Sequence, residues 1–176
     1  MLVSSDFEEL IGLCDRLIVM HDGVLTGELQ REEFNQDKLL SYAVGQGEGA
    51  AANFLIGQKY PGFYAAQLAI SPIYGLQDAT ADALEREKLW IMTSSNDRQS
   101  CDAMEGAISY WKNDDIRVNS AVWDVDWSEQ KFAQAAKELA AKKGTVKYTV
   151  IDGGCREYAW CIGHRIEAIR DWLMAQ

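Results

Sequence analysis

The chain has little proline, little histidine and few basic residues. Its 176 residues include only two prolines and two histidines, and 27 acidic residues outnumber 17 basic ones, which gives a formal net charge of -10. A surplus of acidic residues opposes the neutralisation of phosphates that nucleic-acid binding requires, so we expect no nucleic-acid partner. Because 48% of the residues are apolar and no low-complexity tract is present, the chain should fold.

The sequence also lacks the patterns of membrane insertion and of metal binding. Its apolar runs are far shorter than a membrane span, and its first ten residues carry acids where a secretory signal is basic and apolar. We therefore expect a cytoplasmic protein without membrane insertion. The four cysteines show no C-x-x-C spacing, so we expect no metal site and no cofactor. Cys14 and Cys101 fall on apolar helix faces and are predicted to be buried free thiols.

A helix start and a hairpin pattern occupy the first 45 residues. Ser5 and Glu8 form a capping box before an apolar run, which predicts a helix over about 5–15. The apolar runs RLIVM and VLTGELQ flank an Asp-Gly pair, which is the strongest short-range signal for a β-hairpin. A second short helix is predicted over about 36–43.

This N-terminal stretch resembles the C-terminal end of the ATP-binding subunit of sugar ABC importers. The likeness lies in VSSDFEELIGLCDRLIVMHDGVLTGEL and in the REEFNQDKLLSYAVG that follows. In that family the segment lies downstream of the parts that hold ATP. The chain contains no G-x-x-x-x-G-K-[ST] loop and no signature motif, so the resemblance does not imply ATPase activity. It does suggest a role as a tail that docks on a transporter subunit.

From Gly45 onward, short β-rich runs alternate with helical patterns. The runs are AAQLAI (65–70), KLWIMT (88–93), RVNSAVW (117–123) and KYTVI (147–151). Apolar stripes at helical spacing lie on the segments between and after them: Cys101, Met104, Ile108 and Trp111; Phe132, Ala135, Ala136 and Leu139; Ile162, Ile166, Ile169 and Leu173. Asp126 or Ser128 is expected to cap the second of these helices. The pattern predicts an α/β fold with a mainly parallel sheet and flanking helices.

Residues 45–176 resemble the C-terminal half of an α/β-hydrolase of the bacterial serine-esterase and prolyl-oligopeptidase-like type. GQGEGAAANFLIGQKYPGFYAAQLAISPIYG resembles the turn that carries the nucleophile, with the helix and strand after it. KLWIMTSSND resembles the strand whose end carries the triad acid, and HRIEAIRDWLMAQ resembles the closing helix. The resemblance implies a partial, hydrolase-like half-sheet over 46–176, joined to the importer-like tail over 1–45 in one compact unit.

Two of the three triad positions in this resemblance hold residues that cannot perform the chemistry. Gly47 stands where the family has its nucleophilic serine, and Arg156 stands where it has its histidine; glycine has no oxygen, and arginine stays protonated. Asp97 matches the triad acid, although capping of the following helix by Asn96 or Asp97 is the preferred interpretation. His164 lies too late for the triad and is expected to be a surface or core histidine.

These observations lead to three alternative functions. The first is a non-catalytic hydrolase-like protein that binds a small ligand or a partner; the expected ligand site comprises Gly45, Gly47, Glu48 and Gly49, where backbone N–H groups at a helix start can bind an anion. The second is an active hydrolase of esters or peptides with Cys155 as a displaced nucleophile, because the neighbouring Arg156 and a helix N-terminus both favour the thiolate. The third is a transporter-accessory or interaction protein.

The absence of the N-terminal strands of a hydrolase sheet has a physical consequence. Such a half-sheet has an open edge, which is a template for pairing with another chain. We therefore expect the RLIVM and VLTGELQ strands to pack on or pair with that edge. We also expect the protein to form a homo-oligomer through an open sheet edge.

Overall fold

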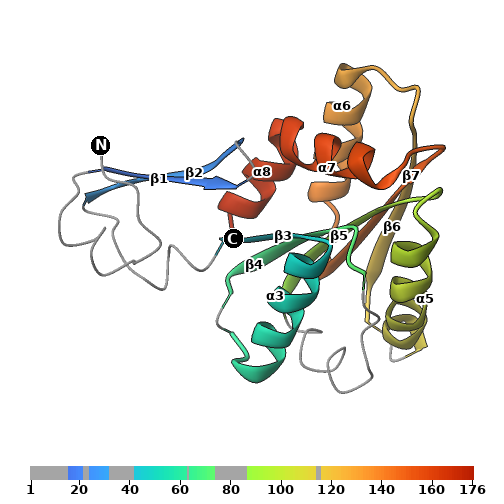
Figure 1. The fold of residues 1–176 in the computed structure, drawn as a ribbon, viewed down its shortest axis with the longest axis horizontal. Helices are drawn as coiled ribbons and strands as arrows, with labels where there is room; N and C mark the ends of the chain where they lie inside the picture. Colours follow the sequence, from blue (N-terminus) through green and yellow to red (C-terminus); the bar gives the residue numbers. More distant parts are fainter. Residues whose placement is uncertain (1–15, 22–23, 32–41, 63, 74–86, 114–115) are drawn as a thin grey trace.

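Five parallel strands with helices on both faces make up most of the described chain (Figure 1). The computed structural model describes residues 16–21, 24–31, 42–62, 64–73, 87–113 and 116–176. The strands of the sheet are β3 (Tyr42–Gln46), β4 (Ala66–Ile70), β5 (Lys88–Ser94), β6 (Val118–Asp124) and β7 (Val146–Asp152). The helices are α3 (Glu48–Lys59), α5 (Arg98–Asn113), α6 (Glu129–Ala140), α7 (Arg156–Arg165) and α8 (Glu167–Met174). The predicted α/β class with a mainly parallel sheet is confirmed.

The strand order decides which face each helix covers. The order is β3-β4-β5-β7-β6, so β7 lies between β5 and β6. In a parallel sheet, right-handed crossovers place the connecting helix on a face that depends on the direction in which the chain moves across the sheet. The chain moves one way through α3 and α5, and it moves back through α6. Accordingly, α3 and α5 pack on one face, whereas α6, α7 and α8 pack on the other (Figure 1).

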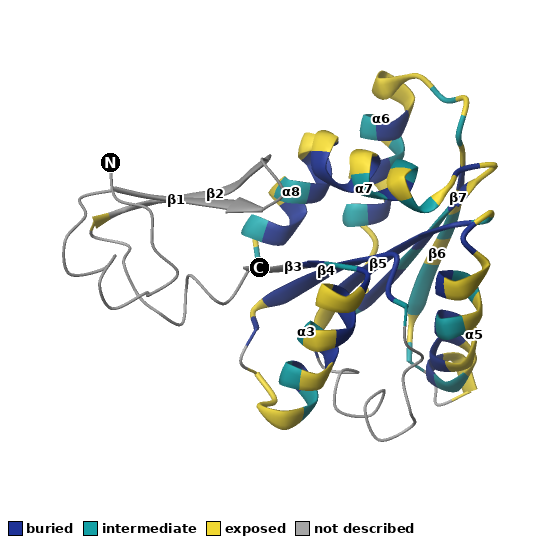
Figure 2. Ribbon diagram, viewed as in Figure 1, coloured by how far each residue is buried: buried dark blue, intermediate teal, exposed yellow. Residues whose placement is uncertain are grey.

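Two apolar cores, one on each face, explain the composition of the central strands. All of β4 and nearly all of β5 are buried, as continuous apolar runs in a doubly covered sheet should be (Figure 2). Under α6, α7 and α8, the indole of Trp90 makes edge contacts with Trp172 and Trp123, with ring centroids 5.2 Å and 6.4 Å apart. Under α3 and α5, the core includes Phe54 and Trp111.

The predicted apolar stripes face these cores. Nearly all of their residues are buried; the exceptions are the half-buried Cys101 and Ala135. The third stripe spans two helices, because the backbone is extended at Ile166 (φ -79°, ψ 105°) and separates α7 from α8. Of the two candidate caps for α6, Ser128 takes the role, since its hydroxyl accepts a hydrogen bond from the N–H of Lys131 at 3.3 Å.

The hairpin forms as predicted but does not join the large sheet. β1 (Arg16–His21) pairs antiparallel with β2 (Val24–Gln30) in a two-stranded sheet of its own, so the expected pairing with an open edge is not found. Tyr42 and Ala43, assigned to the second short helix, instead belong to β3, because their backbones pair with β4 in a parallel ladder. The rest of that helix, the first predicted helix and Cys14 lie outside the described residues.

Candidate functional site

The carboxyl ends of β5 and β7 form a topological switch point. The two strands are neighbours, but the chain leaves β5 for α5 on one face and leaves β7 for α7 on the other. Ligands of open α/β sheets bind in the crevice at such a point, outside the carboxyl ends of the strands. The predicted site residues Asp97 and Arg156 both lie here, directly before α5 and at the first position of α7.

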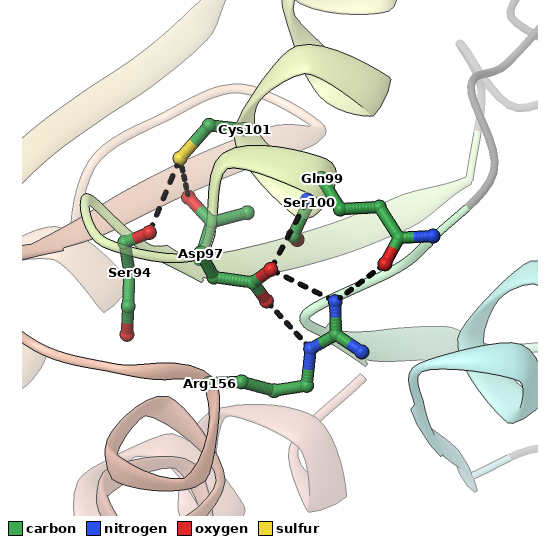
Figure 3. A network of polar contacts seen from close by, with 7 residues as sticks. Ser94, Asp97, Gln99, Ser100, Cys101 and Arg156 are labelled. Atoms are coloured by element: carbon green, nitrogen blue, oxygen red, sulfur yellow. Dashed lines mark hydrogen bonds and ion pairs between the residues drawn. The ribbon is translucent and has the colours of Figure 1, made fainter.

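A bidentate ion pair joins Asp97 to Arg156 across this switch point (Figure 3). The Nε of Arg156 lies 2.8 Å from Oδ2 of Asp97, and Nη2 lies 2.8 Å from Oδ1. Nη2 also donates to Oε1 of Gln99 at 3.0 Å. The carboxylate side chain is only 5% exposed and the guanidinium side chain is 28% exposed. A parallel, two-bond arrangement of this kind is the strongest ion-pair geometry available to arginine.

Asp97 also caps α5, and it is one of the two caps that the sequence predicted. Its Oδ1 accepts a long hydrogen bond of 3.4 Å from the N–H of Ser100, and its carbonyl accepts from the N–H of Cys101 at 3.0 Å. Asn96, the other candidate cap, instead donates through its side chain to the carbonyl of Gly153 at 2.9 Å. The two interpretations of Asp97 are therefore compatible, because one carboxylate holds both the helix start and Arg156.

The surroundings of Asp97 favour its charged form. Burial alone would raise its pKa, but the hydrogen bonds and charge of Arg156, with a smaller contribution from the Ser100 N–H, outweigh burial and leave the pKa below its ordinary value. A carboxyl whose pKa is lower in the folded state stabilises the fold above its unfolded pKa. This stabilisation is lost as the pH falls through the folded pKa.

We therefore predict an acid-dependent loss of stability that Asp97 controls. Urea unfolding between neutral pH and about pH 3 should show the free energy of unfolding falling more steeply in the unaltered chain than in Asp97→Asn, which carries no titrating group there. Asp102→Asn is the matched control, because Asp102 is an exposed carboxylate on the same helix. Equal acid sensitivity in the unaltered chain and Asp97→Asn would contradict the prediction.

The turn between β3 and α3 has the backbone of a sharp strand-to-helix junction. Gly47 has φ 54° and ψ -114°, a region that residues with a side chain rarely adopt, and its N–H donates to the carbonyl of Ile70 at 2.9 Å. A Cβ added at Gly47 would meet no heavy atom within 4 Å, whereas one added at Gly45 would lie 2.6 Å from the backbone of Ala50. A Cβ at Gly49 would also meet no atom within 4 Å. Of the three glycines, Gly45 and Gly47 are required by geometry.

Ser71, at the end of β4, was not identified from the sequence. Its φ of 47° is positive, its side chain is fully buried, and its N–H donates to the carbonyl of Met92 at 2.7 Å. The hydroxyls of Ser71, Ser94 and Ser100 are buried and outside hydrogen-bond geometry with the described residues. The sequence signal that could have identified this site is the Ser-Pro pair directly after an apolar strand, a common turn start. These hydroxyls add unused hydrogen-bonding capacity near Asp97.

The remaining predicted residues lie in three different settings. Cys155 is exposed and is the N-cap of α7, so its expected place at a helix start is confirmed, but the adjacent guanidinium is committed to Asp97 and Gln99. His164 is buried in the last turn of α7 and its Nε2 contacts the side-chain amide of Gln46, which agrees with a core histidine. Cys101, expected to be buried, is half-buried, and its thiol hydrogen-bonds to the carbonyl of Ser94.

Two classes of site are not found within the described ranges. No group of three or more His, Cys, Asp or Glu residues in that part of the chain is placed to hold a metal ion. None of the described helices is both long and apolar enough to cross a bilayer. The carboxyl edge combines the Asp97–Arg156 ion pair with the glycine-dependent β3–α3 turn.

Comparisons with known proteins bear on the N-terminal segment. The chain is 57% identical over 49 residues to a protein assigned as a ribose/galactose/methyl galactoside import ATP-binding protein of Halalkalibacterium halodurans, a match that covers 28% of this chain and 9% of that protein. It is 48% identical over 44 residues to the ribose import ATP-binding protein RbsA of Oceanobacillus iheyensis, covering 25% and 9%. For the protein of the same name from Clostridium tetani, the identity is 51% over 43 residues, covering 24% and 8%.

The likeness of the N-terminal segment to sugar importer ATP-binding proteins is thus confirmed. The chain spans less than a tenth of the length of these curated relatives. No protein-family model matches the chain, and no solved structure matches it. The hydrolase resemblance of the larger part stays a prediction.

Proposed function

We propose that residues 46–176 form a non-catalytic α/β-hydrolase-like unit that binds a small anionic ligand at the carboxyl edge of the sheet. The observation that carries this proposal is the Asp97–Arg156 ion pair, with both bonds at 2.8 Å. In a serine hydrolase the triad acid orients a histidine that takes the proton of the nucleophile. Here the same acid is paired with a guanidinium, which stays protonated and cannot act as a base.

The β3–α3 turn supports the same proposal. A hydrolase nucleophile sits on a sharp, strained turn between a strand and a helix, and Gly47 has a strained backbone at such a junction. Glycine supplies no attacking oxygen, so the covalent route is absent. The open space around a Cβ at Gly47 leaves room for an atom of a ligand beside the first N–H groups of α3.

The chemistry of the edge favours an anion with hydrogen-bonding oxygens, such as a carboxylate. Arg156 uses Nε and Nη2 for its contacts with Asp97 and Gln99, which leaves Nη1 as a further donor on a side chain that is 28% exposed. The buried hydroxyls of Ser71 and Ser94 are further donors. Because Asp97 already neutralises the guanidinium, we expect weak, millimolar-range affinity for a simple carboxylate.

The test combines turnover with binding. The purified chain should hydrolyse p-nitrophenyl acetate no faster than buffer, because it lacks both the nucleophile and the base. Turnover that disappears in Cys155→Ala but persists in Cys161→Ala, the matched variant of a second exposed thiol, would instead establish the displaced-nucleophile alternative. Titration with acetate, followed by the amide NMR signals of Gly47 and Glu48, should show saturable shifts that are lost in Arg156→Gln. Absence of any saturable shift would overturn the binding proposal.

A second candidate function rests on the importer-like segment. The identity of 57% over 49 residues supports a role in which this segment contacts a sugar importer subunit. A pull-down of importer subunits with the full chain should then lose its signal when residues of the β1–β2 hairpin are scrambled. If the chain with the scrambled hairpin retains the importer subunits as well as the unaltered chain does, this role is contradicted.

A further inference from the structure

Within the described residues, no strand pairs with the outer edge of β6. Among the described strands, β6 pairs only with β7, so half of its backbone N–H and C=O groups face away from the sheet. The strand has seven residues and contains neither proline nor lysine, which are the usual devices that keep an edge strand from pairing with another chain. Unlike the central strands, β6 is buried at only one of its positions, Trp123 (Figure 2).

An apolar side chain stands exposed on this edge. Val122 is 64% exposed, and it is one of three large apolar residues exposed in the described part of the chain. The other two, Leu55 and Tyr60, lie on α3 and at its end, so neither belongs to a strand. Burial of a valine side chain stabilises an interface because it removes apolar surface from water. An exposed valine beside unpaired backbone groups is therefore a favourable position for an added strand.

The charges at the two ends of β6 indicate which strand is added. Exposed Arg117 precedes the strand, whereas exposed Asp124 and Asp126 lie at and after its end. If a second β6 pairs antiparallel about a two-fold axis, the basic end of each strand lies next to the acidic end of the other. Such an isologous interface closes on itself as a dimer, because the β6 edge of each copy is then paired. A parallel addition would instead place like charges together.

We infer that β6 is the interface of a homodimer, in which it pairs antiparallel with the β6 of a second copy and joins two five-stranded sheets into one. This assignment is independent of any ligand at the carboxyl edge. The sequence led us to expect contact with another chain at the edge where β3 lies. The inferred interface lies instead at β6, on the opposite side of the sheet. In the dimer, the Val122 side chain of each copy is buried at the interface.

Sedimentation equilibrium of the full chain over a range of concentrations tests the interface. The unaltered chain should show a concentration-dependent dimer, and Val122→Lys should weaken it by at least about tenfold, because the change removes apolar burial from both copies and introduces two charges at the pairing edge. Leu55→Lys is the matched control, since Leu55 is 62% exposed but lies on a helix, and it should leave the dimer unchanged. A chain that is monomeric throughout, or one that responds equally to both lysines, would overturn the assignment.

A charge exchange tests the antiparallel direction. Arg117→Asp should weaken the dimer, and adding Asp126→Arg to the same chain should partly restore it, because one of the two acids at the facing end is then replaced by a base. Circular dichroism of each variant verifies that the fold is retained. If the single and double variants are equally weak, the proposed direction of pairing is wrong.

Discussion

The double variant Gly47→Ser, Arg156→His is expected to hydrolyse p-nitrophenyl acetate about 10²- to 10³-fold faster than the unaltered chain. The serine would occupy a turn whose backbone has φ 54° and ψ -114°, with open space for its side chain. The histidine would stand where the guanidinium now reaches Asp97, so the carboxylate could orient it through one ring N–H. If the proposed hydrolase-like arrangement holds, the two changes supply a nucleophile and a base beside the carboxylate of Asp97.

Each single variant is a control for this result. Gly47→Ser alone has no base, and Arg156→His alone has no nucleophile, so both should stay at the rate of the unaltered chain. Serine at a positive φ costs about 1–3 kcal/mol of stability, so folding must be verified by circular dichroism before rates are compared. A folded double variant that remains inactive would contradict the assignment of Gly47 and Arg156 to former triad positions. Acetate binding is measured on the unaltered chain, so the binding proposal can hold even if the double variant is inactive.

The second large effect is expected at Gly45. Gly45→Ala should destabilise the chain by about 3 kcal/mol or more, because its Cβ would lie 2.6 Å from backbone atoms of Ala50, which cannot move without displacing the start of α3. Urea unfolding followed by tryptophan fluorescence measures this change, since several tryptophans lie in the core.

Gly49→Ala provides the matched comparison for the same turn. Gly49 lies in the first turn of α3, and an added Cβ there meets no heavy atom within 4 Å. Alanine is the better helix former, so this variant should be neutral or more stable by up to about 1 kcal/mol. Similar losses from both substitutions would show that the close approach at Gly45 does not decide the stability of the turn.

Local patterns predicted the strands and helices of the larger part well. The four β-rich runs correspond to β4, β5, β6 and β7 within one residue at each end, because most of these runs are rich in β-branched and aromatic residues that local inspection detects. β3 was not predicted as a strand, since YAVGQ is short and contains a glycine. Its pairing with β4 is a long-range contact, which local propensity does not report.

The sequence identified individual residues of the site but not the contacts between them. Asp97 and Arg156 were singled out, yet their bidentate bond depends on β7 lying directly beside β5, although α5, β6 and α6 separate the two strands in the sequence. Strand order is a property of the whole sheet and leaves no local signature. Ser71 was missed for a similar reason, because its backbone strain and burial follow from contacts with β5. The hydroxyl of a serine after a strand does not by itself indicate a site.

The strand order also affects how the sheet can assemble during synthesis. β7 has the highest residue numbers of the five strands, yet it occupies an interior place and forms the link between β5 and β6. Until residues 146–152 leave the ribosome, β6 has no partner in this sheet, and the edge of β5 stays open. Completion of the sheet must therefore wait for the last quarter of the chain, and a chain interrupted before β7 would expose an unpaired β6 and the open edge of β5 to its neighbours.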